Sequence, residues 1–272
     1  MTLVKHSISR DTVEHISTSK GEPSWMTELR LSALAYYENL SRDAAFQEIQ
    51  AFVEPPKTSV PSHEWPRDLS AVIEERGDEE GLIVQRDSTI LSRSITKDQT
   101  KKGVMYTDLT TALRLNPGLV RQYFAQLVKP DELFSALNTA FWSGGTFLYV
   151  PAHVQIELPF HTCYWMTTPG AAMFPRTVLV AEKGSVVSLV DDFLSADWDK
   201  ASLAVSTVEL YVQEGARVNH KQVHHWGKGV RHENRQMSSV AFGGKLECSQ
   251  VSDPRPVMTL ERVAELYPEV RL

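Results

Sequence analysis

A repeat of about 30 residues in the second half of the chain constrains the fold more than any other feature. The segment RTVLVAEKGSVVSLV, residues 176–190, is followed one period later by STVELYVQEGARVNHKQV, residues 206–223. Each unit has a strand, a tight polar or glycine turn and a second strand, and its apolar side is too small to be buried alone. A fixed period in this range is typical of repeat architectures, whose units bury their cores by stacking.

The alignment of the two units predicts which residues lie side by side. It pairs Thr177-Val178 with Thr207-Val208, Lys183-Gly184 with Glu214-Gly215, and Val186 with Val218.

An entry into the repeat precedes these units. A helix is predicted over Leu133–Phe141, and the breaker Ser143-Gly144-Gly145 follows it. Two short strands are then expected, Thr146–Val150 and Val154–Leu158, with a corner at Pro151-Ala152-His153. The pattern favours a parallel β-helix, a solenoid of β-coils, and the alternative is a β-sandwich, which also uses short alternating strands.

Three regions follow from these patterns. Residues 1–142 are expected to be mostly helical, with a polar, proline-rich connector at 41–80. The β-helix repeats are placed at 143–250, and 251–272 is a short tail with one helix over Leu260–Tyr267.

Smaller elements can be placed inside the first region. A helix beginning at Pro23 carries an apolar stripe at helical spacing. Gly81–Gln85 and Ser88–Arg93 read as a strand pair, and helices are expected over Leu109–Leu115 and Leu119–Leu127.

Composition excludes several classes of function. The net charge of −6 and pI of about 5.9 argue against a nucleic-acid or anionic-membrane surface. No apolar run approaches the ~20 residues that span a bilayer. The N-terminal stretch has no apolar signal-peptide core, which predicts a cytoplasmic protein. The two cysteines, Cys163 and Cys248, are expected to remain thiols.

Several segments together resemble the SufB/SufD family, the β-helical scaffold proteins of the SUF iron–sulfur cluster assembly system. They are GEPSWMTELRLSAL (21–34), GLIVQRDS (81–88), KGVMYTDLTTAL (102–113), FSALNTAFWSGGTFLYVP (134–151), RTVLVAEKGSVVSLV (176–190) and ARVNHKQVHHW (216–226). The resemblance implies a right-handed parallel β-helix behind an N-terminal helical region. It also implies a non-catalytic subunit that works with SufB-like and SufC-like partners, the latter an ABC-type ATPase.

Two positions make the chain look more like SufD than SufB. SufB-like chains carry a cysteine in a VEGC-type segment, and Phe193 stands near that place here. The VQNW-like motif reads Val223-His224-His225-Trp226. Because the only thiols are Cys163 and Cys248, and a cluster generally needs about four thiolate-type ligands, we expect no stably bound cofactor. An iron–sulfur cluster or iron is expected only as a transient cargo.

The chain stops soon after its third repeat, whereas family members are usually longer. Their later coils mediate SufB–SufD pairing and their C-terminal helical domain docks SufC. We therefore expect a SufC-type ATPase to bind this chain weakly or not at all. The open edge of the last coil is expected to be capped by the tail or covered by a second copy in a homodimer.

Histidines gather on one predicted strand. His220 and His224 share a face, which makes them candidate metal ligands, but no carboxylate or cysteine stands at ligand spacing nearby in the sequence. The alternative, which we favour, is that these histidines face solvent or form hydrogen bonds on the strand and bind no metal.

The remaining candidates have structural interpretations. Cys163 is a weak candidate for metal or redox chemistry, because its aromatic neighbours favour a buried thiol. Arg176 resembles a basic position of the family's β-helix interior, and the alternative is a surface arginine in an ion pair. Gly144, Gly145, Gly184 and Gly215 are expected at tight corners.

No P-loop, G-x-S-x-G, HExxH or CxxC motif occurs, so no enzymatic activity is expected. Two alternatives to the scaffold stay open. One is a shortened family member without assembly activity. The other is a carbohydrate-active β-helix enzyme, for which Asp191-Asp192 is the candidate acidic pair although adjacent strand residues face opposite ways.

Overall fold

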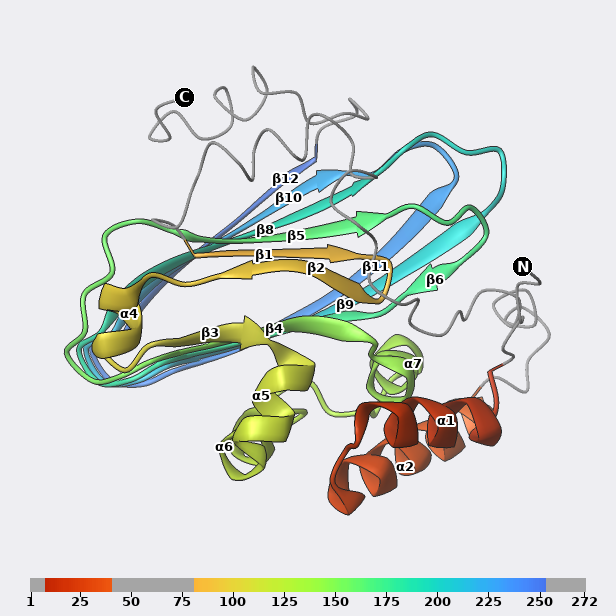
Figure 1. Ribbon diagram of the computed structural model, residues 1–272, viewed down its shortest axis with the longest axis horizontal. Helices are drawn as coiled ribbons and strands as arrows, with labels where there is room; N and C mark the ends of the chain where they lie inside the picture. The colour runs from red at the N-terminus through yellow and green to blue at the C-terminus, as the bar shows by residue number, and fades with distance from the viewer. Residues whose placement is uncertain (1–7, 41–80, 253–272) are drawn as a thin grey trace.

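The computed structural model describes residues 8–40 and 81–252. Its strands form two sheets, ordered β12-β10-β8-β5-β1-β2 and β11-β9-β7-β4-β3, with β6 beside β9 (Figure 1). The strands are β1 (Leu82–Arg86), β2 (Thr89–Ser94), β3 (Met105–Asp108), β4 (Gly144–Val150), β5 (Phe160–Met166), β6 (Ala172–Met173), β7 (Pro175–Ala181), β8 (Val186–Ser195), β9 (Ser202–Val212), β10 (Arg217–His225), β11 (Val230–Val240) and β12 (Lys245–Ser252). The helices are α1 (Arg10–Lys20), α2 (Ser24–Leu40), α4 (Lys97–Lys101), α5 (Leu109–Leu115), α6 (Pro117–Tyr123) and α7 (Leu133–Phe141).

The chain winds as a solenoid. From β4 onward it alternates between the two sheets, and successive strands within each sheet pair in parallel. A β-sandwich of antiparallel strands would not give this pairing. The predicted parallel β-helix is therefore confirmed, and residues 176–226 contain no helix.

The predicted alignment of the repeats was wrong by one residue. Thr177 pairs with Val208, Thr207 pairs with Arg176, and Val186 pairs with Arg217. A shift of one residue moves every side chain to the other face of a strand. The apolar pattern could not reveal this, because β7 and β9 are buried along their whole length and so carry apolar residues on both faces. The turn glycines Gly184 and Gly215 do occupy matching left-handed positions.

The second predicted entry strand, Val154–Leu158, was also wrong. That segment makes only an isolated bridge, Gln155 to Val186, and the strand is β5 at Phe160–Met166. Val154 and Ile156 still pack against the solenoid core. Their alternating inward positions explain why the sequence resembled a strand.

The other local predictions agree closely with the structure. Helices α5 and α7 have the predicted bounds, and α2 begins directly after Pro23. Helix α6 begins and ends earlier than predicted. The predicted strand pair forms β1 and β2, which are antiparallel to each other, while β1 runs parallel to β5.

The sheets thus begin before residue 143, and the domain division at 142 stays a prediction. The proline-rich connector at 41–80 and the helix expected over Leu260–Tyr267 lie outside the described residues.

Apolar side chains fill two compartments. Inside the coils, leucines and valines from both sheets, such as Leu148, Leu179 and Leu210, form one core. On the outer face of the β4-β7-β9 sheet, α1, α2, α5, α6 and α7 cover two more clusters (Figure 1). This helical layer explains why β7 and β9 are buried on both faces. None of the described helices is long and apolar enough to cross a membrane.

Candidate functional site

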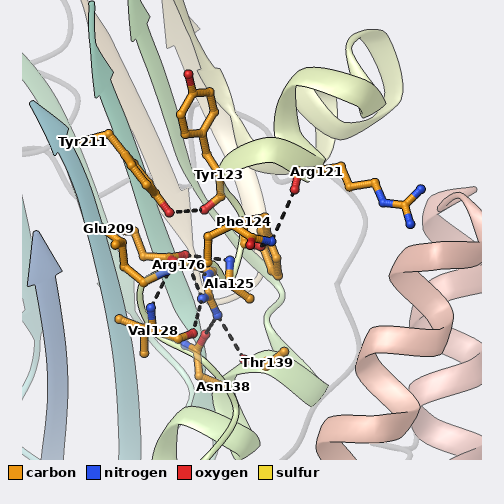
Figure 2. Close-up of polar contacts among 12 residues, drawn as sticks. Arg121, Tyr123, Phe124, Ala125, Val128, Asn138, Thr139, Arg176, Glu209 and Tyr211 are labelled. Carbon is orange, nitrogen blue, oxygen red and sulfur yellow. Dashed lines mark hydrogen bonds and ion pairs between the residues drawn. The ribbon is translucent and has the colours of Figure 1, made fainter. Parts of the chain in front are cut away.

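Arg176 lies on the helix-covered side of β7 and is fully buried. Its guanidinium donates to Glu209 Oε2 at 2.8 and 3.1 Å, from Nη2 and Nε. It also donates to Asn138 and Thr139 of α7 and to the carbonyl of Val128 (Figure 2). The ring of Phe124 stacks on it at 4.3 Å. Arg176 therefore joins sheet to helix and is not a surface arginine, but it lies under the helical layer outside the coils and not in the β-helix interior that the resemblance implied.

Glu209, the partner of Arg176, is equally buried and holds the loop after α6. It accepts hydrogen bonds from the backbone N–H groups of Ala125, Leu127 and Val128 at 2.8–3.1 Å (Figure 2). Ala125 has a φ of 57°, a left-handed conformation that is uncommon outside glycine. The carboxylate of Glu209 thus stabilises a strained turn as well as the buried cation.

A second buried arginine fastens the N-terminal helices. Arg30 of α2 pairs with Glu22 at 2.7 Å, donates to the carbonyls of Ala140 and Trp142, and stacks on the Trp142 ring at 4.3 Å. The ammonium of Lys20 lies 4.6 Å from the centre of the same ring. Burial, and then the nearby Arg30 charge, lower the pKa of Lys20 to about 7.

A chain of polar side chains runs through the interior of the coils, across successive strands. Neighbouring members are joined by hydrogen bonds of 2.9–3.2 Å. We call it the interior polar chain, and in order it contains Tyr106, Thr162, Thr146, Tyr164, Thr177, Asp191 and His220. Buried polar groups cost free energy unless they are bonded, so the continuity of this chain keeps a polar path inside an apolar solenoid.

The path ends in an ion pair. His220 Nε2 and Asp191 Oδ2 are 3.0 Å apart, and both side chains are fully buried. Burial works against the charged imidazole, but the hydrogen bond and charge of Asp191, together with the neighbouring Cys248, outweigh it and raise the pKa of His220 to about 9. His220 is therefore an imidazolium at neutral pH. Two atoms of the pair, His220 Nδ1 and Asp191 Oδ1, have no hydrogen-bond partner among the described residues.

Cys248 lies one coil further on, opposite His220 in the register of β10 and β12. Gln236 Nε2 donates to its sulfur at 3.0 Å. The thiol is exposed and lies in a surface depression of about 310 Å³. The depression is lined by Gln222, Asn234, Gln236, Cys248, Ser249 and Gln250.

Phe193 points into the interior beside this path. Its ring stacks between Tyr164, at 4.9 Å, and His224, at 5.0 Å, and Trp226 and His232 close the cluster. At the place where a SufB-like chain is expected to carry a cysteine, this chain therefore has a stacked, buried aromatic ring.

The two histidines of this cluster stay neutral. Burial lowers the pKa of His224 to about 4 and that of His232 to about 3. Ser206 bonds to His232 Nε2 at 2.8 Å, whereas neither nitrogen of His224 has a partner among the described residues.

The structure does not bring the three metal candidates, His220, His224 and Cys163, together. Within the described residues, no group of three or more histidines, cysteines or acidic residues is arranged to hold a metal ion. Cys163 lies on the other face of its strand, in an apolar cluster with Leu82 and Val84. Although no carboxylate or cysteine stands at ligand spacing from His220 in the sequence, the pairing of the strands brings Asp191 and Cys248 to it.

Gly184 and Gly215 lie in turns, whereas Gly144 and Gly145, expected at a corner, are the first two residues of β4. Gly145 has a φ of 129°, and a Cβ there would lie 1.9 Å from the carbonyl oxygen of Arg176, so only glycine fits. Ser143 precedes it and bonds to the carbonyl of Phe174, and Gly144 packs on the Gln85 side chain. Trp226 directly follows β10, and its ring packs against that of His232.

Sequence reasoning missed Glu209 and Cys248 as site residues and weighed Asp191 only as half of an acidic pair. The only signal for them was the spacing of 28–31 residues between neighbours in adjacent coils, which becomes informative once the register is known.

Comparison with known proteins adds family information. Residues 164–259 match the family model described as SUF system FeS cluster assembly, SufBD core domain, and residues 81–161 match the SufBD protein N-terminal region. Similar curated proteins are iron–sulfur cluster assembly SufBD family proteins of Staphylococcus epidermidis and Staphylococcus haemolyticus, each 28% identical, and of Staphylococcus aureus, 26% identical. Each match covers 260 residues, 89% of this chain and 56% of the relative. The chain thus spans about half the length of the curated relatives it matches.

Proposed function

Because this chain belongs to the SufBD family, we propose that it acts in iron–sulfur cluster assembly as a non-catalytic, SufD-like scaffold subunit. The names of the relatives support the process, and the interior of the solenoid supports the SufD-like role. Partners of SufB-like and SufC-like type belong to the same proposal.

The observation that carries the SufD-like assignment is the position of Phe193. Cluster building needs thiolate or comparable ligands that converge on iron. Phe193 is 1% exposed and stacked on both faces, so its position supplies packing instead of a sulfur ligand. The two cysteines, Cys163 and Cys248, lie on opposite faces of the β-helix wall, one in an apolar cluster and one in the exposed depression.

The proposed contact with a SufB-like chain uses the exposed ends of the sheets. Among the described residues, β11 and β12 are the terminal strands of their sheets, and most of their side chains are exposed. Terminal strands present backbone N–H and C=O groups that pair readily with a strand of another protein. A homodimer through the same strands is the competing arrangement.

The test is a calorimetric titration of this chain with a SufB-like protein of the same organism. We expect binding at micromolar affinity or tighter, and its loss in Ser238→Pro. Ser238 is exposed on β11, and the alternation of hydrogen bonds from Ala241 N to Val212 O places its N–H on the outer side of the strand. Proline there blocks edge pairing without removing a bond to β9. Ser238→Ala is the matched control and should bind like the wild type.

Absence of binding, or equal binding by Ser238→Pro, would remove the partner part of the proposal. Self-association of the chain in light scattering would favour the homodimer. Weak binding of a SufC-like ATPase stays a prediction, measured in the same way with that protein in the syringe.

The carbohydrate-active enzyme is not favoured. Asp191 points into the coil and bonds to His220, while its neighbour Asp192 belongs to the opposite face of β8. Two carboxylates on opposite faces cannot flank one glycosidic bond.

A further inference from the structure

Three groups from successive coils meet at the end of the interior polar chain. Asp191 of β8 holds the ring of His220 on β10, and Cys248 of β12 is the register partner of His220. A carboxylate, an imidazole and a thiol in this order form the arrangement that activates cysteine nucleophiles, in which the acid orients the ring and the ring takes the thiol proton. The proposed scaffold role uses none of these contacts.

The geometry points to Cys248 as a reactive thiol that is modified by small disulfides, with His220 as its proton acceptor and Asp191 as the residue that positions His220. The sulfur is accessible from the depression of about 310 Å³. This volume is near the lower end of the range found for small-molecule sites. The lining is uncharged and rich in amides, which suits a polar, low-molecular-weight disulfide rather than an apolar ligand.

Two further contacts support this role. His220 Nε2 is engaged by Asp191, while Nδ1 has no hydrogen-bond partner among the described residues although the ring is fully buried. That nitrogen is the one left to exchange a proton with the thiol. Gln236 Nε2 donates to the sulfur at 3.0 Å, a contact that stabilises negative charge on it.

The reaction balances without any outside oxidant. The proton of Cys248 moves to His220, and the Cys248 sulfur then attacks one sulfur of the disulfide R–S–S–R. A new bond forms between Cys248 and that sulfur, and the original S–S bond breaks. The other half leaves as R–S⁻, which takes a proton from His220 or from water. The electron pair of the broken bond departs with the leaving thiolate, so one disulfide replaces another.

The pH dependence follows from the groups that face His220. Asp191 and Cys248 favour its charged form, and Tyr164 approaches the other side of Asp191 through Thr177. The raised pKa of His220, about 9, means that the ring beside the Cys248 sulfur is positively charged through the neutral range. An ordinary thiol is only a few per cent ionised at pH 7.

The experiment measures the rate of reaction with 2,2′-dithiodipyridine in a Cys163→Ser background, so that Cys248 is the single thiol. At pH 7 we expect His220→Gln to react on the order of ten-fold more slowly than its parent, because a lower thiolate fraction is partly offset by higher nucleophilicity. At pH 10, above the ordinary pKa of a thiol, the parent and His220→Gln should react at rates that agree within about two-fold. Intact mass should show one adduct per chain.

Asp191→Asn tests the positioning role, because the ring of His220 remains while its partner loses charge. We expect a smaller reduction at pH 7 and the same recovery at pH 10, and this variant carries the comparison if His220→Gln does not fold. His15→Gln, an exposed histidine on α1, is the matched control and should leave the rate unchanged. Equal rates at pH 7 in parent, His220→Gln and Asp191→Asn, or a deficit that persists at pH 10, would overturn the proposal.

Discussion

Two buried ion pairs on neighbouring coils, Arg176–Glu209 and Asp191–His220, are built in opposite ways. In each pair both side chains are fully buried. Around Arg176 and Glu209, side chains of helix α7 and backbone groups of the loop after α6 complete the hydrogen bonding. Around Asp191 and His220, one oxygen and one ring nitrogen have no partner among the described residues.

The difference distinguishes an ion pair that stabilises the fold from an ion pair that can take part in a proton transfer. A saturated buried pair stabilises one arrangement of sheet and helices, because each of its atoms would lose a partner if the arrangement changed. An incompletely bonded pair next to an exposed thiol retains a nitrogen that can exchange a proton. Burial and charge alone would not distinguish the two.

The largest effect is expected from breaking the saturated pair. Glu209→Gln leaves the Arg176 guanidinium buried without a counter-charge, and we expect the free energy of unfolding to fall by about 3–5 kcal/mol. Chemical denaturation at pH 7 measures it.

The matched control is an exposed pair between the residue that precedes α7 and strand β11. Arg235 and Glu132 are 2.8 Å apart, and about half of each side chain is exposed. Glu132→Gln should cost less than about 1 kcal/mol. Similar losses in both variants would show that saturation and burial are not what gives the Arg176 pair its importance.

A second prediction concerns the pH dependence of stability. His220 has a pKa near 9 in the folded protein and 6.5 when unfolded. Its stabilising contribution is therefore complete below pH 6.5 and is lost as pH rises through 9, on the order of 3 kcal/mol in total. The unfolding free energy of wild type minus that of His220→Gln should decrease steadily from pH 6.5 to 9.

The difference between variants is needed because other groups act in the opposite direction. Because the pKa of Lys20 is lowered to about 7, this residue makes the folded protein more stable as pH rises from 7 toward 10.5. The pKa values of His224 and His232 are lowered to about 4 and 3, so these residues make the folded protein less stable as pH falls below 6.5. A flat difference for His220→Gln across pH 6.5–9 would contradict the charged state assigned to His220.

A smaller effect is expected at the aromatic cluster. Phe193→Leu keeps an apolar side chain but removes the stacking on Tyr164 and His224, so we expect a loss of about 1–3 kcal/mol from the residual cavity. Thermal unfolding would measure this loss. The comparison is Phe134→Leu, because Phe134 is a partly buried phenylalanine of α7. A neutral result would remove the packing role given to Phe193.

Local features of the fold were predictable because they depend on neighbouring residues. The bounds of α5 and α7 follow from breakers and apolar spacing, and the turns at Gly184 and Gly215 follow from their glycines. The register was not predictable to one residue, because the helical layer buries both faces of β7 and removes the alternation that normally fixes it.

The site depended on that register. Asp191, His220 and Cys248 are separated by 29 and 28 residues, so no single segment of the sequence relates them to one another. Only the pairing of β8, β10 and β12 brings them together. Arg176 could be singled out by resemblance, but its partner Glu209 and the strained turn at Ala125 required the structure.

The central claim, that this chain is a scaffold that does not build a cluster by itself, is tested most directly by anaerobic reconstitution with iron and sulfide. The chain alone should hold no stable visible chromophore after desalting, because its two thiols fall short of the roughly four ligands that a cluster needs. A stable chromophore on the chain alone that disappears in Cys163→Ser or Cys248→Ser would contradict the claim.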